Sequence, residues 1–418
     1  MQHSRGVLYS ALELQRAWLR PAAELASRAV AVLGGATFLP AAIVRANHAL
    51  FHRLSRPYLR PPFAIERVTA HGGEVTIHEE VIATRSFCRL VRFRREATDP
   101  ARAAELVRDP RVLVVAPLSG HHPTLLRDTI STLLQAHDVY VTDWIDAREV
   151  PIEAGPFHLA DYVGYVRGFM RELDPRDLHV VAVCQPTVPT LAAVAIEAAA
   201  GAPTPRTLTL MGGPVDPRRN PTAVNRFATE HPLAWFERHL IHRVPAGFPG
   251  HGRAVYPGFL QLSAFVQMNP LRHAQAYRSY WFDHVRGDAE AIAAHEKFYD
   301  EYNAVLDMDA AYYLDTVRTV FQDTALARGT WEIDGALVRP AAITGTALFT
   351  IEGEHDDISG IGQTAAAHEL CTGLPERARE HLVAEGCGHY GLFSGHRWRE
   401  NIYPRVHAFV RAHAGASA

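Results

Sequence analysis

The stretch Val181-Ala182-Val183-Cys184-Gln185-Pro186 decides the fold, because it joins an apolar run to a helix-forming segment. The apolar run predicts a buried strand, and residues 190–200 have the composition of a helix. A sharp strand-to-helix turn displays its side chain at the top of a sheet, where a substrate carbonyl can reach it. Here the side chain at that turn is the thiol of Cys184.

The composition is that of an ordinary globular chain. The 418 residues are 48% hydrophobic and 21% charged, with a formal net charge of −3 at pH 7. This balance gives no basis for binding a polyanion, so we expect no nucleic acid partner. The four cysteines form no CxxC pair, which argues against zinc and disulfides and favours a reducing, cytoplasmic setting. A Walker-type phosphate loop is absent from the sequence, and we expect no metal and no required cofactor.

We predict an N-terminal helical extension over residues 1–65, which is basic, with eight arginines and two glutamates up to Arg60. Its uncharged stretch at residues 29–44 contains Gly34, Gly35 and Pro40, so it is too short and too broken to span a membrane. An apolar stripe suits docking on the core, which we favour, or contact with a hydrophobic surface. The stripe consists of Leu8, Leu12, Trp18, Leu19 and Leu25.

Short apolar runs alternate with helical stretches over most of the remaining chain. Residues 75–78 and 87–93 predict two antiparallel leading strands. Further strands are expected at 112–116, 139–142, 179–183, 207–210, 347–351 and 380–383, and helices at 124–135, 160–173, 190–200, 362–370 and 397–413. This order predicts an α/β protein with a mostly parallel central sheet.

One interval breaks the alternation and predicts a helical cap or lid over residues 215–343. The core is then divided into a first part, 66–214, and a second part, 344–418. Residues 256–321 hold 13 Phe, Tyr or Trp. A lid that packs its own small core explains most of these rings, and the others would line a groove for an apolar substrate.

A cysteine nucleophile needs a base and an acid that orients the base, in the chain order nucleophile, acid, histidine. Cys184, Asp356 and His389 supply this order, and each follows a predicted strand. The carboxyl ends of parallel strands meet at one edge of a sheet, so we expect these side chains to converge. Asp357 and Asp216 stay open as alternative acids, and His355 as an alternative base.

The tetrahedral oxyanion of such a reaction needs two preorganised N–H donors. The backbone N–H of Gln185 is one candidate, because it follows the nucleophile and opens the helix. The second donor is expected from the loop after residues 112–116, at Leu118 or Ser119. His121 and His122 in the same loop are further candidate contributors.

Several motifs together resemble the intracellular poly(3-hydroxybutyrate), or polyhydroxyalkanoate, depolymerase family of the α/β-hydrolase superfamily. The resemblance covers nearly the whole chain. Its motifs are Ala182-Val-Cys-Gln-Pro186, Thr142-Asp-Trp144, Met211-Gly-Gly-Pro214, Asn220-Pro-Thr222, Gly353-Glu-His-Asp-Asp-Ile-Ser-Gly360 and Gly388-His-Tyr-Gly391. The chain departs from the family at His122, where a tyrosine is expected, and at Cys387, where an aliphatic residue is expected.

The resemblance implies an α/β-hydrolase fold with Cys184, Asp356 and His389 as the catalytic triad. It implies cytoplasmic granules of storage polyester as the partner and substrate. The products would be 3-hydroxybutyrate oligomers or monomers, formed through an acyl-thioester, or hydroxyacyl-CoA where coenzyme A is the acceptor.

Two alternatives and the oligomeric state stay open. A polyester synthase uses the same thiol chemistry but keeps glycines as Gly-x-Cys-x-Gly, where this chain has Ala182 and Pro186. A catalytically idle granule-binding protein would retain the fold without the activity.

Overall fold

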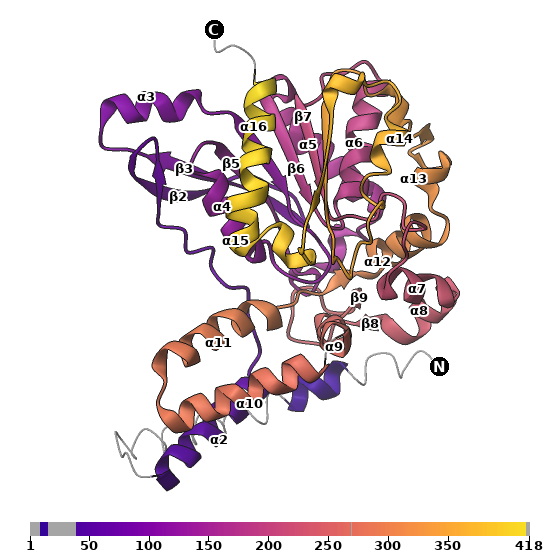
Figure 1. Cartoon of the computed structure of the whole chain (residues 1–418). Coiled ribbons are helices and arrows are strands. Elements are labelled where there is room, and N and C mark those ends of the chain that lie inside the picture. Colours follow the sequence, from indigo (N-terminus) through magenta and orange to yellow (C-terminus); the bar gives the residue numbers. More distant parts are fainter. Residues whose placement is uncertain (1–8, 16–38, 269, 415–418) are drawn as a thin grey trace.

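The computed structural model describes residues 9–15, 39–268 and 270–414. A nine-stranded sheet with helices on both faces forms the body, and a helical arm extends from one end of it (Figure 1). The strands of the sheet are β1 (Arg67–Ala70), β2 (Gly73–Thr84), β3 (Cys88–Glu96), β4 (Arg111–Val115), β5 (Asp138–Trp144), β6 (Leu178–Val183), β7 (Thr207–Met211), β13 (Ala347–Gly353) and β14 (Arg379–Ala384).

The strand order is β1-β2-β3-β5-β4-β6-β7-β13-β14. The first three strands are antiparallel to their neighbours, and the strands from β5 to β14 run parallel. Both faces of β4, β6, β7 and β13 are buried, which explains why these segments are near-continuous apolar runs. Their carboxyl ends therefore form one protected edge where polar loops can meet.

Helices cover both faces of the sheet (Figure 1): α4 (Arg127–Leu133) and α16 (Tyr403–His413) on one, and α5 (Leu159–Glu172) and α6 (Thr187–Ala199) on the other. Shorter helices are α3 (Pro100–Arg108), α14 (Ala367–Leu370) and α15 (Gly395–Arg397). The predicted strands are confirmed, and β1 is an additional one.

The predicted helix at 362–370 is wrong in its first half. Only Ala367–Leu370 is α-helical, and the residues before it form turns. The buried carboxylate of Glu352 accepts hydrogen bonds from the N–H groups of Gly362, Thr364 and Ala365, which fixes the backbone there in a non-helical path. The predicted helix at 397–413 is interrupted as well, because a π-helical turn over Trp398–Ile402 precedes α16.

The interval between β7 and β13 holds α7 (Ala223–Glu230), α8 (Leu233–Leu240), α9 (Gly258–Met268), α10 (Pro270–Arg286), α11 (Ala289–Asn303), α12 (Ala310–Thr316) and α13 (Ala325–Arg328). It also contains short antiparallel strands, which the sequence did not predict: β8 (His242–Arg243), β9 (Ala254–Tyr256), β10 (Met308–Asp309), β11 (Glu332–Ile333) and β12 (Ala336–Leu337). The sequence here lacks the apolar runs that define a parallel strand, because each of these strands is only two or three residues long.

Helix α2 (Leu39–Ser55) packs with α10 and α11 to form the arm (Figure 1). Arg53 of α2 is buried and forms an ion pair with Asp300 of α11 at 2.7 Å. The indole Nε1 of Trp281 donates to Asn47 Oδ1 at 2.8 Å. Part of the predicted N-terminal extension is thus docked on the insertion.

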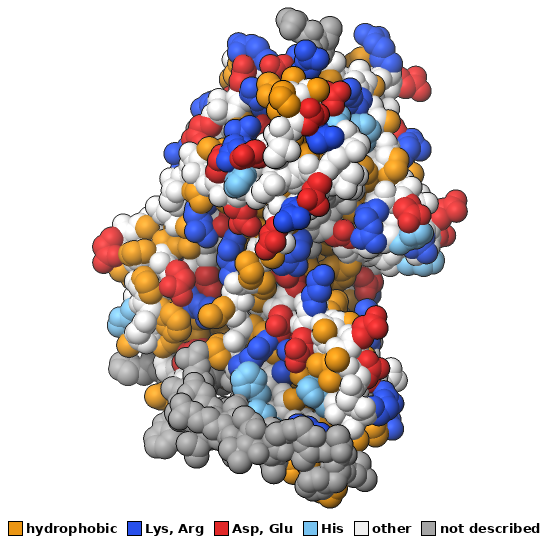
Figure 2. Space-filling view, turned by 90° about the vertical axis from the view of Figure 1, so that its left-hand side faces the viewer, with side chains coloured by type: hydrophobic (Ala, Val, Ile, Leu, Met, Phe, Trp, Pro, Cys, Tyr) orange, Lys and Arg blue, Asp and Glu red, His pale blue; other side chains and the backbone are white. Residues whose placement is uncertain are grey.

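Residues 9–15 form a further helix, in which the buried Tyr9 hydroxyl donates to Asp307 at 2.5 Å. Of the predicted apolar stripe, Leu12 lies in this helix, and Leu8, Trp18, Leu19 and Leu25 lie outside the described residues. Within the described ranges, no helix combines the length and the apolar character needed to cross a bilayer. On the face seen in Figure 2, basic and acidic side chains are intermixed.

His137 is a fully buried histidine that follows α4 and lies beside α16. Its Nδ1 donates to the Leu133 carbonyl at 2.9 Å, and its Nε2 lies 3.4 Å from Nδ1 of His407. Burial lowers the pKa of His137 to about 3. The hydrogen bond to Leu133 raises this pKa, whereas charge interactions with His407, His179 and Arg95 lower it further.

We expect His137 to make the fold sensitive to acid. The unfolded chain protonates this histidine near pH 6.5 and the folded protein only near pH 3, so stability falls as pH falls through this window. At about pH 5 the loss is about 2 kcal/mol. His137→Asn keeps an N–H donor that does not titrate, so urea denaturation should show a smaller loss between neutral and acidic pH than in the parent. Equal acid sensitivity would contradict this account.

Candidate active site

Cys184 occupies the sharp turn between β6 and α6. Its φ of +68° lies in the left-handed region, which residues with a Cβ rarely adopt. The Cys184 N–H donates to the Met211 carbonyl at 2.7 Å, and the Cys184 carbonyl accepts from Thr187 N–H at 3.1 Å. This geometry places the thiol at the N-terminus of α6, where the helix dipole favours a negatively charged sulfur.

Asp356 and His389 follow the ends of β13 and β14. Nδ1 of His389 lies 2.8 Å from Oδ2 of Asp356, and because a carboxylate accepts, Nδ1 carries the proton. Oδ1 of Asp356 accepts from the N–H groups of Ile358 at 2.9 Å and Ser359 at 2.8 Å. One carboxylate oxygen therefore holds the turn, and the other orients the imidazole.

Cys184 also interacts with His389. Burial alone would lower the pKa of His389, which is 4% exposed. Charge interactions with Cys184 and Asp356, together with hydrogen bonds to both, outweigh burial and raise the pKa of His389 well above its usual value. The imidazole is therefore well placed to accept the thiol proton.

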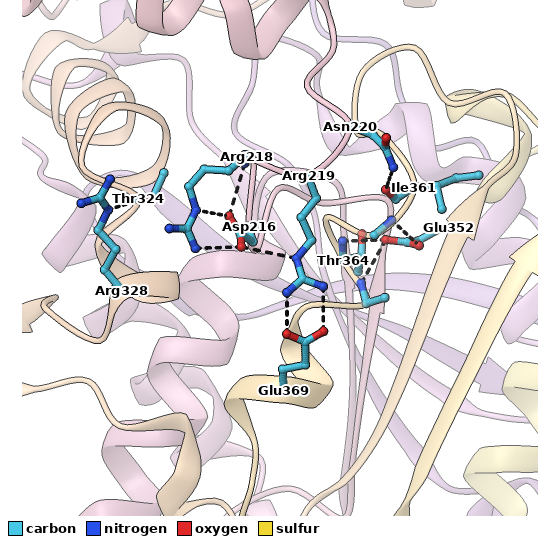
Figure 3. A network of polar contacts seen from close by, with 12 residues as sticks. Asp216, Arg218, Arg219, Asn220, Thr324, Arg328, Glu352, Ile361, Thr364 and Glu369 are labelled. Carbon is cyan, nitrogen blue, oxygen red and sulfur yellow. Dashed lines mark hydrogen bonds and ion pairs between the residues drawn. The ribbon is translucent and has the colours of Figure 1, made fainter.

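The structure thus brings together the three residues that the sequence nominated, Cys184, Asp356 and His389. The alternatives lie elsewhere. Asp216 is paired with Arg218, whose Nε lies 2.7 Å away, and with Arg219 (Figure 3). Asp357 and His355 are exposed on the surface of the same loop.

Buried polar contacts hold the turn that carries Asp356 (Figure 3). Glu352, the penultimate residue of β13, is 1% exposed. Its Oε1 accepts from Thr364 N–H at 2.7 Å and its Oε2 from Gly362 N–H at 2.9 Å. The Asn220 amide donates to the Ile361 carbonyl at 2.6 Å, which joins this turn to the loop after β7.

The predicted oxyanion donors lie on two loops that face each other. Leu118 N–H donates to the side-chain Oε1 of Gln185 at 3.4 Å, so Leu118 is directed at the residue that follows the nucleophile. Ser119 is the next residue and is only partly buried. Leu118 is therefore the better placed of the two candidates for the second donor.

His121 and His122 are both buried. Nε2 of His121 donates to the Tyr302 carbonyl at 3.1 Å, which ties the oxyanion loop to the insertion. Burial lowers the pKa of His121 to about 4 and that of His122 to about 3, the latter with help from Arg60 and Arg148. Both rings are neutral at physiological pH, so neither supplies a charge to the site.

Sequence reasoning missed two residues of this site. Tyr312 of α12 is 1% exposed and interacts electrostatically with Cys184. Its only signal was membership of the aromatic-rich interval 256–321. Gly212, with φ of +56°, lies against Asp356 and His389, and the Gly-Gly pair at 212–213 was the available signal.

The fold and the site define the class: this is an ester-hydrolysing α/β-hydrolase, with its polar groups at the carboxyl edge of a mostly parallel sheet. Residues 212–414 match the family described as PHB de-polymerase C-terminus. This match supports an α/β-hydrolase of the PHB depolymerase type. The matched range includes Asp356 and His389, and Cys184 precedes it.

Solved structures with a similar fold have low sequence identity. A 2-hydroxy-6-oxo-6-phenylhexa-2,4-dienoate hydrolase from a Rhodococcus strain has a TM-score of 0.42 and 14% identity, covering 81% of this chain and 99% of that one. A haloalkane dehalogenase loop variant from Bradyrhizobium elkanii has a TM-score of 0.44 and 14% identity, covering 82% and 98%. No curated protein matches the sequence.

We expect Gly212→Ala to damage the site directly. A Cβ at this position would lie 2.7 Å from Leu392 Cδ1, 3.3 Å from Asp356 Oδ2 and 3.4 Å from His389 Cε1. The variant should lose about 1–3 kcal/mol of stability and at least about tenfold in esterase kcat/KM, because the acid and base must shift. Gly201→Ala is the matched control, since Gly201 has φ of +67° and open space around it. Equal activity losses in both variants would contradict this assignment.

Alkylation of the folded protein should modify Cys184 in preference to the other three cysteines. Cys184 is partly exposed, whereas Cys88, Cys371 and Cys387 are buried. Burial also raises the pKa of each of these three thiols, that of Cys371 to about 12. Brief treatment with iodoacetamide, followed by peptide mass mapping, should find label on Cys184. Label on Cys387 at a similar rate would show that this second thiol is accessible and reactive.

Proposed function

We propose that this chain cleaves the ester bonds of intracellular storage poly(3-hydroxybutyrate) with Cys184 as nucleophile, His389 as base and Asp356 as the orienting acid. The observation that carries the proposal is the buried imidazole of His389, which is held by Asp356 at 2.8 Å and also interacts with Cys184. The PHB depolymerase-type domain supports the polymer as substrate.

In the first half-reaction His389 accepts the proton of the Cys184 thiol, and the sulfur attacks the ester carbonyl carbon. The carbonyl oxygen becomes an oxyanion, which the backbone N–H groups of Gln185 and Leu118 would stabilise. The tetrahedral intermediate then expels the alcohol end of the polymer, and His389 returns the proton to the leaving oxygen. The acyl group remains on Cys184 as a thioester.

In the second half-reaction an acceptor releases the acyl group. Water that loses a proton to His389 attacks the thioester carbonyl, and the products are a 3-hydroxybutyrate acid end and the free thiol. Hydrolysis needs no cofactor. In place of water, the thiol of coenzyme A would attack the same thioester. The product would then be 3-hydroxybutyryl-CoA, with Cys184 released as the free thiol.

Large apolar side chains exposed on the arm support contact with a polyester granule in the cytoplasm. Val44, Phe51 and Leu54 share one face of α2, and they are 45%, 43% and 66% exposed. Leu271 and Phe282 share a face of α10 and are 74% and 40% exposed. Exposed apolar surface of this kind suits a hydrophobic partner.

Cys184→Ala should abolish turnover of amorphous poly(3-hydroxybutyrate) granules, by on the order of a thousandfold or more, because it removes the nucleophile. Cys371→Ala is the matched control, since Cys371 is a buried thiol remote from the site, on the turn after α14. Soluble products should be identified by mass, with and without coenzyme A.

Each outcome separates one mechanism from another. Hydroxy acids formed without coenzyme A indicate hydrolysis, and hydroxyacyl-CoA formed with it indicates thiolysis. Full activity in Cys184→Ala would overturn the proposal. Polymer growth from hydroxybutyryl-CoA would indicate a synthase, and granule binding without cleavage would indicate an idle binding protein.

A further inference from the structure

Tyr9 is a buried residue of the helix at residues 9–15, and it contacts the insertion about three hundred residues further along the chain. Its hydroxyl donates to Oδ2 of Asp307 at 2.5 Å. Its ring packs edge-on against Phe259 of α9, with a centroid distance of 5.4 Å. Burial raises the pKa of Tyr9 well above its usual value, so the hydroxyl stays protonated and acts as the donor. A specific buried hydrogen bond therefore fixes this helix to the insertion.

Asp307 is buried, and its polar groups join several segments. Its Oδ1 accepts from the N–H of Gly258, the first residue of α9, at 2.8 Å. Its own N–H donates to Oδ1 of Asp146 at 3.1 Å, and its carbonyl accepts from Ala147 N–H at 3.1 Å. Because Tyr9 binds Oδ2, both carboxylate oxygens and both backbone groups of Asp307 have partners. Loss of the Tyr9 hydroxyl would leave one oxygen of a buried carboxylate without its donor, which favours a shift of Asp307.

Leu306, which directly precedes Asp307, is bound to the loop that carries Leu118. Its N–H donates to the Gly120 carbonyl at 2.7 Å. The two segments are in close contact, because a Cβ on Gly120 would lie 3.1 Å from Val305 Cγ1. Leu118 is two residues before Gly120 in the same loop. A shift of Asp307 therefore moves the segment that holds the Leu118 N–H in place.

We propose that Tyr9 is a positioning residue for the Leu118 N–H donor, and that it acts through the hydrogen-bonded segment 306–307. The inference rests on the proposed function, because it takes this N–H as a donor to the oxyanion. A preorganised donor is effective only at hydrogen-bond distance from the oxyanion, so a displaced one stabilises the transition state less. Both half-reactions form an oxyanion. Loss of the tether therefore slows formation and breakdown of the thioester together, which lowers kcat and leaves KM nearly unchanged.

The test is steady-state hydrolysis of p-nitrophenyl 3-hydroxybutyrate by Tyr9→Phe. This change keeps the ring beside Phe259 and removes only the hydroxyl. It should lower kcat about tenfold and change KM by less than about twofold, because the donor is displaced and the ester still binds. An unchanged kcat in the folded variant would overturn the inference.

Alkylation of Cys184 by iodoacetamide separates an effect on the donor from general damage to the site. In this reaction the sulfur displaces iodide from a carbon atom. It needs the thiolate but forms no oxyanion, so it does not use the Leu118 N–H. The rate in Tyr9→Phe should equal that of the parent. A fall in the alkylation rate as large as the fall in kcat would overturn the inference, because it would show that the thiol itself is disturbed.

Tyr140→Phe is the matched control. Tyr140 is also buried, and its hydroxyl donates to a carboxylate oxygen, Oδ2 of Asp138, at 2.9 Å. It lies near the amino end of β5, whereas Cys184 lies at the carboxyl edge of the sheet. Its kcat should equal that of the parent, and thermal unfolding of both variants is measured in parallel. A tenfold fall of kcat in both variants would attribute the effect to stability and overturn the inference.

Asp307→Asn tests the same tether from its other end and replaces Tyr9→Phe if that variant does not fold. A neutral amide has one acceptor oxygen where the carboxylate has two, so it cannot take the place of both. The same fall in kcat with an unchanged alkylation rate is expected. An unchanged kcat in this variant would contradict the tether.

The inference and the proposed function fail in different ways. Hydrolysis of the p-nitrophenyl ester by Cys184→Ala, or no hydrolysis by the parent, would contradict the proposed function. An inactive Cys184→Ala together with an unchanged kcat in Tyr9→Phe would contradict only the positioning role of Tyr9.

Discussion

The strand-to-helix turn at Cys184 is the constraint on which the site depends. A residue with a Cβ at φ of +68° costs about 1–2 kcal/mol, which the surrounding backbone must offset. The neighbouring strand does so, because Met211 accepts the Cys184 N–H at 2.7 Å, and Gly212 N–H in turn donates to Ile351 at 2.9 Å. The ends of β6, β7 and β13 are therefore linked side by side. This register brings the Cys184 thiol and the turn that carries Asp356 to one edge of the sheet.

The turn at Cys184 requires a residue without a side chain at position 213, which is Gly213. A Cβ on Gly213 would lie 2.4 Å from the Cys184 carbonyl oxygen and 1.8 Å from Thr187 Oγ1. Carboxylates complete the arrangement, since Glu352 and Asp356 each accept backbone N–H groups from the turn after β13. Hydrogen bonds to charged acceptors are stronger than those to neutral acceptors. These hydrogen bonds therefore stabilise the turn that carries Asp356 without a large apolar core of its own.

The sequence predicted the sheet, and it nominated three residues at one edge of that sheet, for a simple physical reason. Strands buried on both faces must be continuous apolar runs, and loops at their carboxyl ends converge, so residue order sufficed to nominate Cys184, Asp356 and His389. Contacts between distant segments were not predictable in this way. The side chain of Glu352 overrides the helical preference of residues 362–366, and the place of Tyr312 depends on how the insertion folds back over β6.

The insertion is joined by hydrogen bonds to the loop that carries Leu118. Leu306 N–H donates to the Gly120 carbonyl at 2.7 Å, and His121 donates to Tyr302 at 3.1 Å. A Cβ on Gly120 would lie 2.7 Å from Gln261 Oε1, so the two segments are in close contact. A displacement of the insertion would therefore pull on the loop that carries Leu118. It follows that the insertion supports the loop that carries Leu118, because hydrogen bonds join the two segments.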